Sequence, residues 1–533
     1  MNSWETSKCF ANAITAFYKE GDDDYNMKPA ILVDSENRAV GRIKSGDSVI
    51  FCCTRGEREV QLTDSFVLPD FEYFERRSFH DLYFTIFTLY HHKYLSLDVP
   101  VVFKPKAVQV TIGSVISENG LTQLHIAESE KFAHVTFFFN GGSNASYPGE
   151  EDVKIESPKG VPFEKVPELS VFKIVSKLVE ALEDHKYNFI VVNFANGDVI
   201  GHTHNFDAKI ACAKKVDEAL QSSVEKALKN GYTVVITADH GILETGFKED
   251  GKINVAHTKV PVPFIIVDLF NKHVKLRAGR LANVASTILE LMGLKVPDCF
   301  EQSLLVEKPS YTNKKLVLII LDGWGIGKED HTNPIFVANP AFFNKLVREF
   351  PNTFLKASGE DVGLLPGKAG NSEAGHMNIG AGRVVPQDDV IVKNSFEDGS
   401  FFSNEVLIEA VRRLERTKGN LHLIGLLSER SSHGNVEYIL KCLELAKKFG
   451  LREAFIHLIL DGRSTEPFSA PTMILSLGEK LQQIGLGTIC TIFGRGIALD
   501  RSQDYVGKTK LAYDALVFGV GRHVKCHEMG DRK

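Results

Sequence analysis

The amino-acid sequence predicts an α/β protein with more than one domain, each domain built on a parallel sheet. Short runs of branched and aromatic residues recur along most of the chain, and helical segments separate them. These runs are continuously apolar rather than alternating with polar residues, which is typical of parallel strands that helices cover on both faces. A length of 533 residues exceeds one ordinary domain and favours two to four.

The composition is that of a soluble globular protein, with 43% hydrophobic and 24% charged residues. The formal net charge is -6, so we expect neither a nucleic-acid nor a membrane partner. The first residues lack a signal pattern, and no apolar run approaches the length of a membrane span. The eight cysteines contain no CxxC pair. They predict no disulfide framework and favour a reducing, cytoplasmic setting.

The first predicted strand in chain order is Ser48–Cys53, and Arg55 and Arg58 follow it. Two arginines beside a glycine suit a phosphate or carboxylate clamp, because guanidinium binds such anions in a bidentate fork. A solvated turn is the alternative interpretation. Four more strands are predicted between residues 101 and 300: His134–Phe139, Phe189–Phe194, Thr233–Ala238 and Pro263–Val267. Apolar residues at helical spacing between Ile210 and Leu228 predict a crossover helix, which Asn230 and Gly231 end.

Potential metal ligands flank these strands. Asp239 and His240 end the strand that begins at residue 233, and adjacent side chains on an extended backbone can face two different ions. Asp198 and His202 follow the strand that ends at residue 194, and His257 precedes the strand at residue 263. Ligands of open α/β sheets gather at the carboxyl ends of strands, so the five residues together predict a metal site. Taken alone, Asp239 and His240 would be a polar turn at a strand end, and Asp198 and His202 a capping or surface pair.

The same pattern restarts after residues 301–314, which are polar and predict a linker. The strand Leu316–Leu321 leads directly to Asp322, and Ser372 lies in a turn punctuated by glycines, where most serines are capping residues. Three more strands are predicted: Leu421–Leu427, Phe455–Leu460 and Thr488–Phe493. The residues that follow them include His433, Arg463, Arg495 and Arg501. Arginines at strand ends indicate anion recognition.

Seven motifs together resemble the cofactor-independent phosphoglycerate mutases, which are members of the alkaline phosphatase superfamily. The motifs are EKFAHVTFFFNGG from residue 130, VNFANGDVIGHT from 192, ITADHG from 236, AHTKVPVPF from 256, LDGWG from 321, GNSEAGHMNIGAGR from 370 and LDGR from 460. In that family LDGWG lies near the N-terminus and TADHG near the C-terminus. The order here is reversed, so the chain resembles a circular permutant of the family.

The resemblance implies an alkaline phosphatase-like parallel-sheet domain plus a second α/β transferase-like domain, in circularly permuted order. The metal-binding, phosphatase-like domain is expected at residues 103–388. The transferase-like, substrate-binding domain is expected to be discontinuous and to combine residues 1–102 with residues 389–533. Residues 301–314 would join the ends of the family's usual chain, because permutation is tolerated where termini are exposed and close together.

The resemblance also implies roles for the candidate residues. One metal ion would be held by Asp198, His202 and His257, and a second by Asp239, His240, Asp322 and Ser372. Asp239 and His240 would therefore bind the same ion rather than two different ions. Mn²⁺ is expected, with Co²⁺, Zn²⁺ or Mg²⁺ as alternatives and no 2,3-bisphosphoglycerate. Ser372 would be the nucleophile, with Lys131 and His433 as further catalytic residues. Substrate would be bound by Arg55, Arg58, Arg463, Ser464, Arg495 and Arg501.

The implied function is interconversion of 3-phosphoglycerate and 2-phosphoglycerate through a phosphoserine, a step of glycolysis and gluconeogenesis, by a cytoplasmic monomer. In the family, an Asp follows the Arg of LDGR. This chain departs from the family there, because Ser464 follows Arg463. A serine cannot replace a carboxylate base without help. Two alternatives therefore stay open: a metal-dependent phosphatase or phosphotransferase acting on another small phosphate ester, and a catalytically weak metal-binding scaffold.

Overall fold

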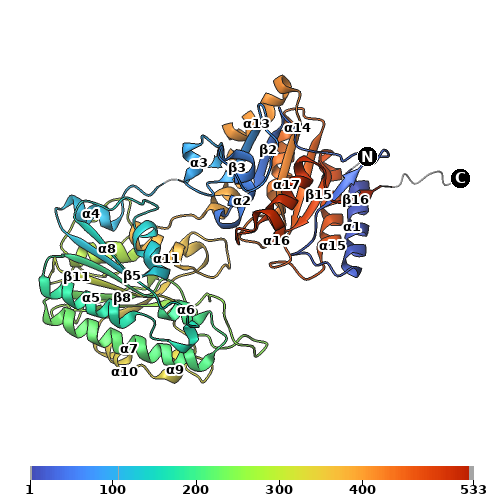
Figure 1. Cartoon of the computed structure of the whole chain (residues 1–533). Helices are drawn as coiled ribbons and strands as arrows, with labels where there is room; N and C mark the ends of the chain where they lie inside the picture. Colours follow the sequence, from blue (N-terminus) through green and yellow to red (C-terminus); the bar gives the residue numbers. More distant parts are fainter. Residues whose placement is uncertain (1–2, 106, 527–533) are drawn as a thin grey trace. The chain divides into compact units, whose positions relative to one another are not determined.

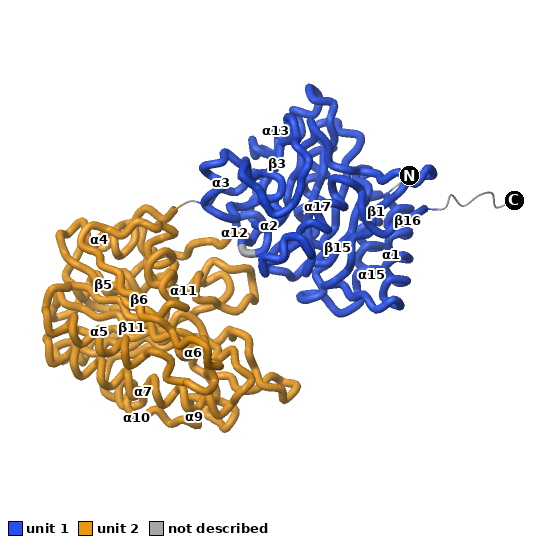
Figure 2. Tube along the Cα trace, in the orientation of Figure 1, with its two compact units in different colours: residues 1–105, 391–533 blue, residues 106–390 orange. Residues whose placement is uncertain are grey.

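A computed structural model describes residues 3–105 and 107–526 (Figure 1). The chain forms two compact units (Figure 2). Unit 1 combines residues 1–105 with residues 391–533, and unit 2 comprises residues 106–390. Each unit contains an eight-stranded, mainly parallel sheet with helices on its faces. The predicted fold class, two α/β domains with parallel sheets, is confirmed.

The sheet of unit 2 has the order β10-β12-β9-β8-β11-β7-β5-β6. Its strands are β5 (Gln123–Glu128), β6 (Glu150–Ile155), β7 (Phe189–Phe194), β8 (Thr233–Thr237), β9 (Val262–Val267), β10 (Gly279–Arg280), β11 (Leu316–Leu321) and β12 (Asn352–Lys356). The run from β8 to β6 is parallel, whereas β9 is antiparallel to both of its neighbours. Strands β7, β8, β9 and β11 are buried along their whole length, which explains their continuous apolar sequences.

Helices cover both faces of this sheet (Figure 1). One face carries α5 (Val171–Asp184) and α7 (Phe206–Lys229), and the other carries α4 (Ile112–Glu118), α8 (Val284–Leu291) and α11 (Ser372–Ala381). The predicted crossover helix is α7. The Asn205 side chain caps its first turn by accepting from the Ala208 amide, and the helix ends at Asn230 as predicted.

The strand predicted at residues 134–139 is wrong, because His134–Phe138 forms a short helix, η2. Val135 and Phe139 are both buried. They are four residues apart, a spacing that places them on one face of a helix. A short apolar run cannot be assigned to strand or helix by periodicity alone, and here the branched and aromatic residues favoured the wrong choice.

The sheet of unit 1 has the order β16-β1-β15-β14-β13-β2-β3-β4. Its strands are β1 (Ala30–Val33), β2 (Ser48–Cys52), β3 (Tyr83–Thr88), β4 (Val101–Phe103), β13 (Leu421–Leu427), β14 (Ala454–Leu460), β15 (Thr488–Gly494) and β16 (Arg522–Lys525). Strands from both ends of the chain alternate in it, since β2 lies directly beside β13. Neither segment of unit 1 therefore forms the sheet by itself.

Two hydrophobic clusters lie on the two faces of this sheet. One is built with α1 (Ser3–Lys19), α13 (Glu405–Thr417), α14 (Val436–Lys448) and α15 (Ala470–Ile484), and the other with α2 (Gly56–Val67), α16 (Arg495–Ala498) and α17 (Lys510–Val517). Helix α1 packs against α15, β15 and β16, so the first and last parts of the chain share one face.

The prediction that the cysteines form no disulfide is wrong for one pair. Cys9 of α1 is bonded to Cys526, just after β16, across 517 positions of sequence and a Cα–Cα distance of 5.5 Å. The pairing arises because α1 packs on the sheet edge that β16 forms. Spacing along the sequence cannot reveal a contact of this kind.

Residues 301–314, all of them described, contain no helix and a single isolated bridge between Leu305 and Leu276. Ser303, Leu304 and Leu305 are buried, and the two leucines join the core of unit 2. The predicted linker is therefore a packed connection within unit 2.

Among the described helices, none combines the length and the apolar character that crossing a bilayer requires.

Candidate functional site

Parallel strands of unit 2 deliver charged side chains to one edge of the sheet. Lys131 follows β5, Asp198 lies on the short helix α6 (Asn196–Gly201) after β7, Asp322 follows β11 and Asp239 follows β8. The four strands β5, β7, β11 and β8 are neighbours and parallel. His257 precedes the antiparallel strand β9 and so lies at the same edge. The predicted gathering of ligands at strand ends is present in the structure.

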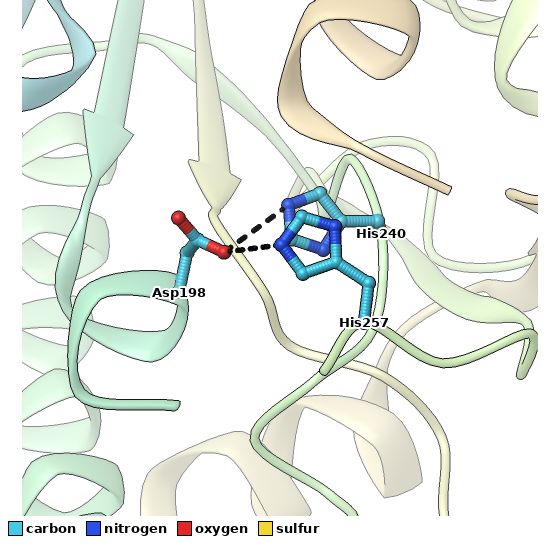
Figure 3. Close-up of side chains that lie close together, drawn as sticks. All are labelled: Asp198, His240 and His257. Atoms are coloured by element: carbon cyan, nitrogen blue, oxygen red, sulfur yellow. Dashed lines mark ion pairs between the residues drawn. The ribbon is translucent and has the colours of Figure 1, made fainter. Parts of the chain in front are cut away.

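A first group of ligand atoms surrounds one carboxylate oxygen, Oδ1 of Asp198. It lies 3.0 Å from Nε2 of His257, 3.3 Å from Nε2 of His202 and 3.6 Å from Nε2 of His240. Figure 3 shows the stacked rings of His240 and His257 turned toward this oxygen. Two imidazole nitrogens and the carboxylate oxygen lie close enough together to bind one ion.

A second group forms around Nε2 of His240. This nitrogen lies 3.5 Å from Oδ2 of Asp239, 3.5 Å from Oδ1 of Asp322 and 2.9 Å from Oγ of Ser372. His240 therefore lies between the two groups and within reach of both. The sequence assigns His240 to the second ligand set alone, whereas in the structure its Nε2 lies close to ligand atoms of both sets.

Backbone carbonyls fix the three imidazole rings. Nδ1 of His202 lies 2.8 Å from the Val255 oxygen, Nδ1 of His257 lies 2.8 Å from the Gly370 oxygen, and Nδ1 of His240 lies 3.3 Å from the Gly241 oxygen. Each Nδ1 is thus a donor, and Nε2 is the ring nitrogen that faces the carboxylates.

Two carboxylate oxygens of the site are buried and accept no hydrogen bond from any residue that the structure describes. They are Oδ1 of Asp198 and Oδ2 of Asp239. Buried carboxylate oxygens are costly unless they are paired or bind a cation. Together with the oriented imidazoles, they fit divalent metal ions that accept mixed nitrogen and oxygen ligands.

Ser372 lies at the first turn of α11, where the Asn371 side chain caps the helix by accepting from the Ala374 amide. Its Oγ is 2.6 Å from Nζ of Lys131 and 3.2 Å from Oδ1 of Asp322. A helix N-terminus carries unpaired amides and a partial positive charge, so it favours a phosphate group beside this hydroxyl.

Lys131 is buried and bridges the carboxylates of the site, with Nζ 2.7 Å from Oδ2 of Asp198 and 2.8 Å from Oδ1 of Asp322. Burial alone would lower the pKa of Lys131, but the charges of Asp322 and Asp198 outweigh it and raise the pKa above its ordinary value. The lysine is therefore a permanent cation beside the Ser372 hydroxyl.

The carboxylates of the site stay ionised. Burial would raise the pKa of Asp198, but Lys131 and the nearby histidines hold it well below the usual range. Burial would likewise lower the pKa of His240, yet Asp239 and Asp322 raise it to about 9. Negative charge dominates this pocket, which suits the uptake of cations.

Two glycines allow the close packing that builds the site. A Cβ at Gly375 of α11 would lie 2.6 Å from the backbone oxygen of Asp239. Gly323 has a φ of 80°, and a Cβ there would lie 2.6 Å from the amide nitrogen of Asp198. Side chains at these positions would push α11 or the β11 turn away from the ligands.

Two residues at the site received no role from the sequence. Nδ1 of His376 lies 3.3 Å from Oδ2 of Asp239, and Nδ2 of Asn193 donates to Oδ2 of Asp322 at 2.8 Å. His376 could have been found, because it follows Ser372 by four positions and shares its helix face. Asn193 becomes visible only when β7 is placed beside β11.

The anion-binding candidates of unit 1 follow a second set of parallel strands, β2, β13, β14 and β15. Arg58 is buried, with Nη1 donating to the Leu499 oxygen at 3.2 Å. His433 is also buried, and its Nδ1 lies 2.9 Å from Oε1 of Glu59. The sequence motifs did not indicate this contact between Glu59 and His433. Arg55 lies half-buried at the start of α2.

Asp461 organises the end of β14. Its carboxylate forms a buried ion pair with Arg495 and accepts the amide of Ser464 at 3.0 Å. Ser464 itself is exposed, as are Arg463 and Arg501. Ser464 also lines a cavity of about 380 Å³ whose other lining residues include Arg430, Val436, Met473 and Leu477.

The fold and the site define a metal-binding α/β protein, and the comparison with family models agrees. The chain belongs to the metalloenzyme superfamily, whose model matches residues 30–296, half of its length. A second model, described as the N-terminus of 2,3-bisphosphoglycerate-independent phosphoglycerate mutases, matches residues 392–530. The chain is accordingly similar to the mutases of that name over this part of unit 1.

Curated relatives carry the same name. A 2,3-bisphosphoglycerate-independent phosphoglycerate mutase of Synechococcus sp. (strain JA-3-3Ab) is 39% identical over 57% of this chain and 57% of its own length. A mutase of Methanosarcina acetivorans is 40% identical over 56% of this chain and 57% of its own length. The alignments thus span little more than half of these relatives.

A solved structure was also found. The phosphoglycerate mutase of Leishmania mexicana, crystallised at low cobalt concentration, is 28% identical, with a TM-score of 0.42 over 51% of this chain and 53% of that chain.

Proposed function

We propose that the chain is a 2,3-bisphosphoglycerate-independent phosphoglycerate mutase that interconverts 3-phosphoglycerate and 2-phosphoglycerate. One observation carries the proposal: Oγ of Ser372 contacts both Nζ of Lys131 and Nε2 of His240 at the N-terminus of α11. A nucleophilic hydroxyl, a fixed cation and a helix N-terminus together suit phosphoryl transfer. The names of the similar mutases support the choice of substrate.

Two divalent ions are part of the proposal. Asp198, His202 and His257 would hold one, and Asp239, His240, Asp322 and Ser372 the other. Mn²⁺ suits this mixture of carboxylate and imidazole ligands, as do Co²⁺ and Zn²⁺, whereas Mg²⁺ prefers oxygen ligands alone. Bound ions would neutralise charge on the phosphoryl group and favour the ionised form of the Ser372 hydroxyl.

The proposed reaction has two transfers. In the first, Ser372 Oγ loses its proton and forms a bond to phosphorus while the bond from phosphorus to the substrate oxygen breaks and that oxygen takes up a proton, which gives phosphoserine and glycerate. In the second, the other glycerate hydroxyl loses its proton and bonds to phosphorus, while the bond from phosphorus to Ser372 Oγ breaks and the serine hydroxyl is protonated again. Lys131 would stabilise the negative charge that develops on the oxygens in both transfers. Water must be excluded, because its attack on phosphoserine would release phosphate.

The proposed substrate ligands belong to unit 1. The phosphate and carboxylate of phosphoglycerate are anions, and guanidinium groups bind both in a bidentate manner. Arg55, Arg58, Arg463, Arg495 and Arg501 follow strands of one sheet, and their positions at the carboxyl edge support this role. His433, held by Glu59, would contact the phosphate or donate a proton.

We infer the domain roles on the same basis. Residues 103–388 would be the phosphatase-like, metal-binding domain, and residues 1–102 and 389–533 the transferase-like domain. Circular permutation is also proposed. It is supported by the order of the matched models, since the one described as an N-terminus matches residues 392–530, after the model that matches residues 30–296.

A phosphatase or phosphotransferase acting on another small phosphate ester is the second candidate. Ser464 favours it, because this exposed hydroxyl stands where the mutase resemblance expects a carboxylate base. The adjoining cavity of about 380 Å³ is partly apolar and would accept a substrate bulkier than glycerate.

A single assay separates these functions. Protein with Mn²⁺ and 3-phosphoglycerate, without 2,3-bisphosphoglycerate, is followed for 2-phosphoglycerate in a coupled reaction and for free phosphate in parallel. Formation of 2-phosphoglycerate supports the mutase, and phosphate release alone supports the phosphatase. Neither product, together with tight metal binding, would leave the metal-binding scaffold. Ser372→Ala is the control for activity from contaminants.

We place the protein in the cytoplasm as a monomer without nucleic-acid or membrane partners. Five of the six unbonded cysteines are buried in the described part of the chain, which accords with a reducing compartment, whereas the Cys9–Cys526 bond requires oxidation. Light scattering measures the mass in solution. Trapping of thiols in cell extracts measures whether this pair is oxidised where the protein works.

A further inference from the structure

A separate group of metal-ligating side chains lies on the edge of the unit 2 sheet. His125 is on β5, and Glu150 and Asp152 are on β6, the terminal strand. The parallel register pairs His125 with Asp152, and Glu150 lies two positions before Asp152 on the same face. Nδ1 of His125 is 3.6 Å from Oε1 of Glu150 and 3.7 Å from Oδ1 of Asp152.

Gln123 determines which nitrogen of His125 carries the proton. Its amide nitrogen donates to the Gly113 oxygen at 2.9 Å, so its amide oxygen faces the ring and lies 3.3 Å from Nε2 of His125. Nε2 is therefore the donor, and Nδ1 keeps a lone pair. That lone pair points at two carboxylates. The His125 side chain is fully buried, and its Nδ1 has no hydrogen-bond partner among the described residues.

Other contacts hold the two carboxylates in place. Asn140 donates to Oε1 of Glu150 at 2.6 Å, and Ser146 donates to Oδ2 of Asp152 at 2.8 Å. Oδ1 of Asp152 remains buried and without a partner within residues 3–105 and 107–526. Nδ1 of His125 and Oδ1 of Asp152 thus lie close to Oε1 of Glu150, and neither of the first two atoms has a donor among the described residues. This arrangement is unfavourable unless a cation or a proton joins them.

We propose that His125, Glu150 and Asp152 bind a divalent cation, at a site separate from the one around Ser372. Two ligands bound to one zinc-like ion at about 2.1 Å, roughly 110–120° apart, lie about 3.4–3.6 Å from each other. The measured separations of 3.6 and 3.7 Å are close to this spacing. One imidazole and two carboxylates suit Zn²⁺, Mn²⁺ or Co²⁺, and each ligand has a neighbour that orients it.

The site would fasten the edge of the sheet. β6 is the terminal strand of the described sheet, and the cation would join it to β5 at a second point besides the backbone ladder. β5 leads directly into the turn that carries Lys131, and Asn140 follows the helix η2. Binding would therefore stabilise the segment that presents Lys131 without touching substrate.

A proton is the competing occupant. Burial raises the pKa of Glu150 to about 7 and lowers that of His125 to about 4, so a neutral Glu150 beside a neutral His125 would also relieve the repulsion. Metal analysis distinguishes the two occupants, because a proton leaves the metal content of the protein unchanged.

The test counts metal ions per chain after equilibrium dialysis of metal-free protein against Co²⁺ or Zn²⁺. Asp152→Asn and His125→Asn should each bind one ion fewer than the wild type. Glu151→Gln is the matched control, since this neighbouring carboxylate is exposed and bonds Tyr187 and Lys186 instead. Equal metal content in all four proteins would overturn the proposal.

A measurement on the wild type covers the case in which the variants fail to fold. Crystals of the full chain grown with Co²⁺ are recorded on both sides of the cobalt absorption edge. An anomalous peak among His125, Glu150 and Asp152 supports the site. Peaks at the Asp198 and Asp239 groups alone would overturn it, and an absent cobalt peak with a protonated carboxyl band in the infrared spectrum would assign the position to a proton.

Discussion

Nζ of Lys131 lies 2.6 Å from Oγ of Ser372, although the two residues are 241 positions apart in the chain. The lysine also contacts the carboxylates of Asp198 and Asp322, so one buried cation touches the proposed nucleophile and two proposed metal ligands. This relationship links the electrostatics of the site to its chemistry.

Ser372→Ala should abolish the phosphoenzyme and reduce turnover by about 10⁴-fold or more, because no other group replaces the nucleophile. The variant should fold, since the helix cap depends on Asn371. Mass spectrometry of acid-quenched protein and the coupled assay provide the two measurements. Ser176→Ala is the control, as that exposed hydroxyl bonds the Phe172 carbonyl within its own helix. Full turnover in Ser372→Ala would exclude the serine mechanism.

Lys131→Met should lower the rate of phosphoryl transfer by about 10²–10³-fold, since it removes a fixed positive charge beside the reacting oxygens. It also leaves Asp198 and Asp322 buried and less compensated, which costs about 3–5 kcal/mol in the metal-free protein. Added Mn²⁺ should recover part of that stability. Thermal unfolding with and without chelator measures this, with the exposed Lys154→Met as control. An unchanged melting temperature in chelator would contradict this charge balance between Lys131 and the two carboxylates.

Ser464→Asp should raise the formation of 2-phosphoglycerate by about 10-fold or more if the missing carboxylate limits the mutase reaction. The amide of Ser464 is held by Asp461, so the new side chain would start from a fixed position. The ratio of 2-phosphoglycerate to free phosphate is the measurement. Ser469→Asp, on the same cavity, should leave the ratio unchanged. If Ser464→Asp also changes nothing, another group already serves as the base.

Glu128→Gln should stabilise the protein at neutral pH relative to acidic pH. Burial raises the pKa of Glu128 from 4.5 to about 6, so the folded state holds the proton more tightly than the unfolded state. The wild type therefore loses stability as the pH rises from about 4.5 through 6, by about 2 kcal/mol. Glutamine cannot ionise, and its amide oxygen can still accept the Ser170 amide.

Urea unfolding in chelator between pH 4 and pH 7 tests this prediction. The difference between Glu128→Gln and the wild type should grow by about 2 kcal/mol across that range, whereas the exposed Glu130→Gln should give a flat difference. A constant difference for Glu128→Gln would mean that the carboxyl group is not the source of the pH dependence.

The sequence allowed the strand ends of unit 2 to be predicted well. Asp198, Asp239 and Asp322 converge because each follows a buried, continuously apolar strand, and the carboxyl ends of parallel strands share one edge. The apolar runs are long and bounded by polar residues, so both the strands and their edge can be read without the structure.

Other features depend on distances in space that leave no local pattern. The position of His240 between both ligand groups follows from how β8 and the loop carrying His257 approach each other. The bond between Cys9 and Cys526 follows from the packing of α1 on the outer strands. The sequence predicts a strand where residues 134–138 form a helix, because an apolar run of about six residues has the same pattern in a buried strand and in a buried helix.

The Cys9–Cys526 bond makes residues 9–526 a covalent ring, with unit 2 as one arc of it and both segments of unit 1 as the other. A protease that cuts one peptide bond inside this ring opens it but releases no fragment, as long as the bond is oxidised. Reduction then separates the two pieces on a denaturing gel. In such a ring, the position of the chain termini has little influence on which parts stay covalently connected.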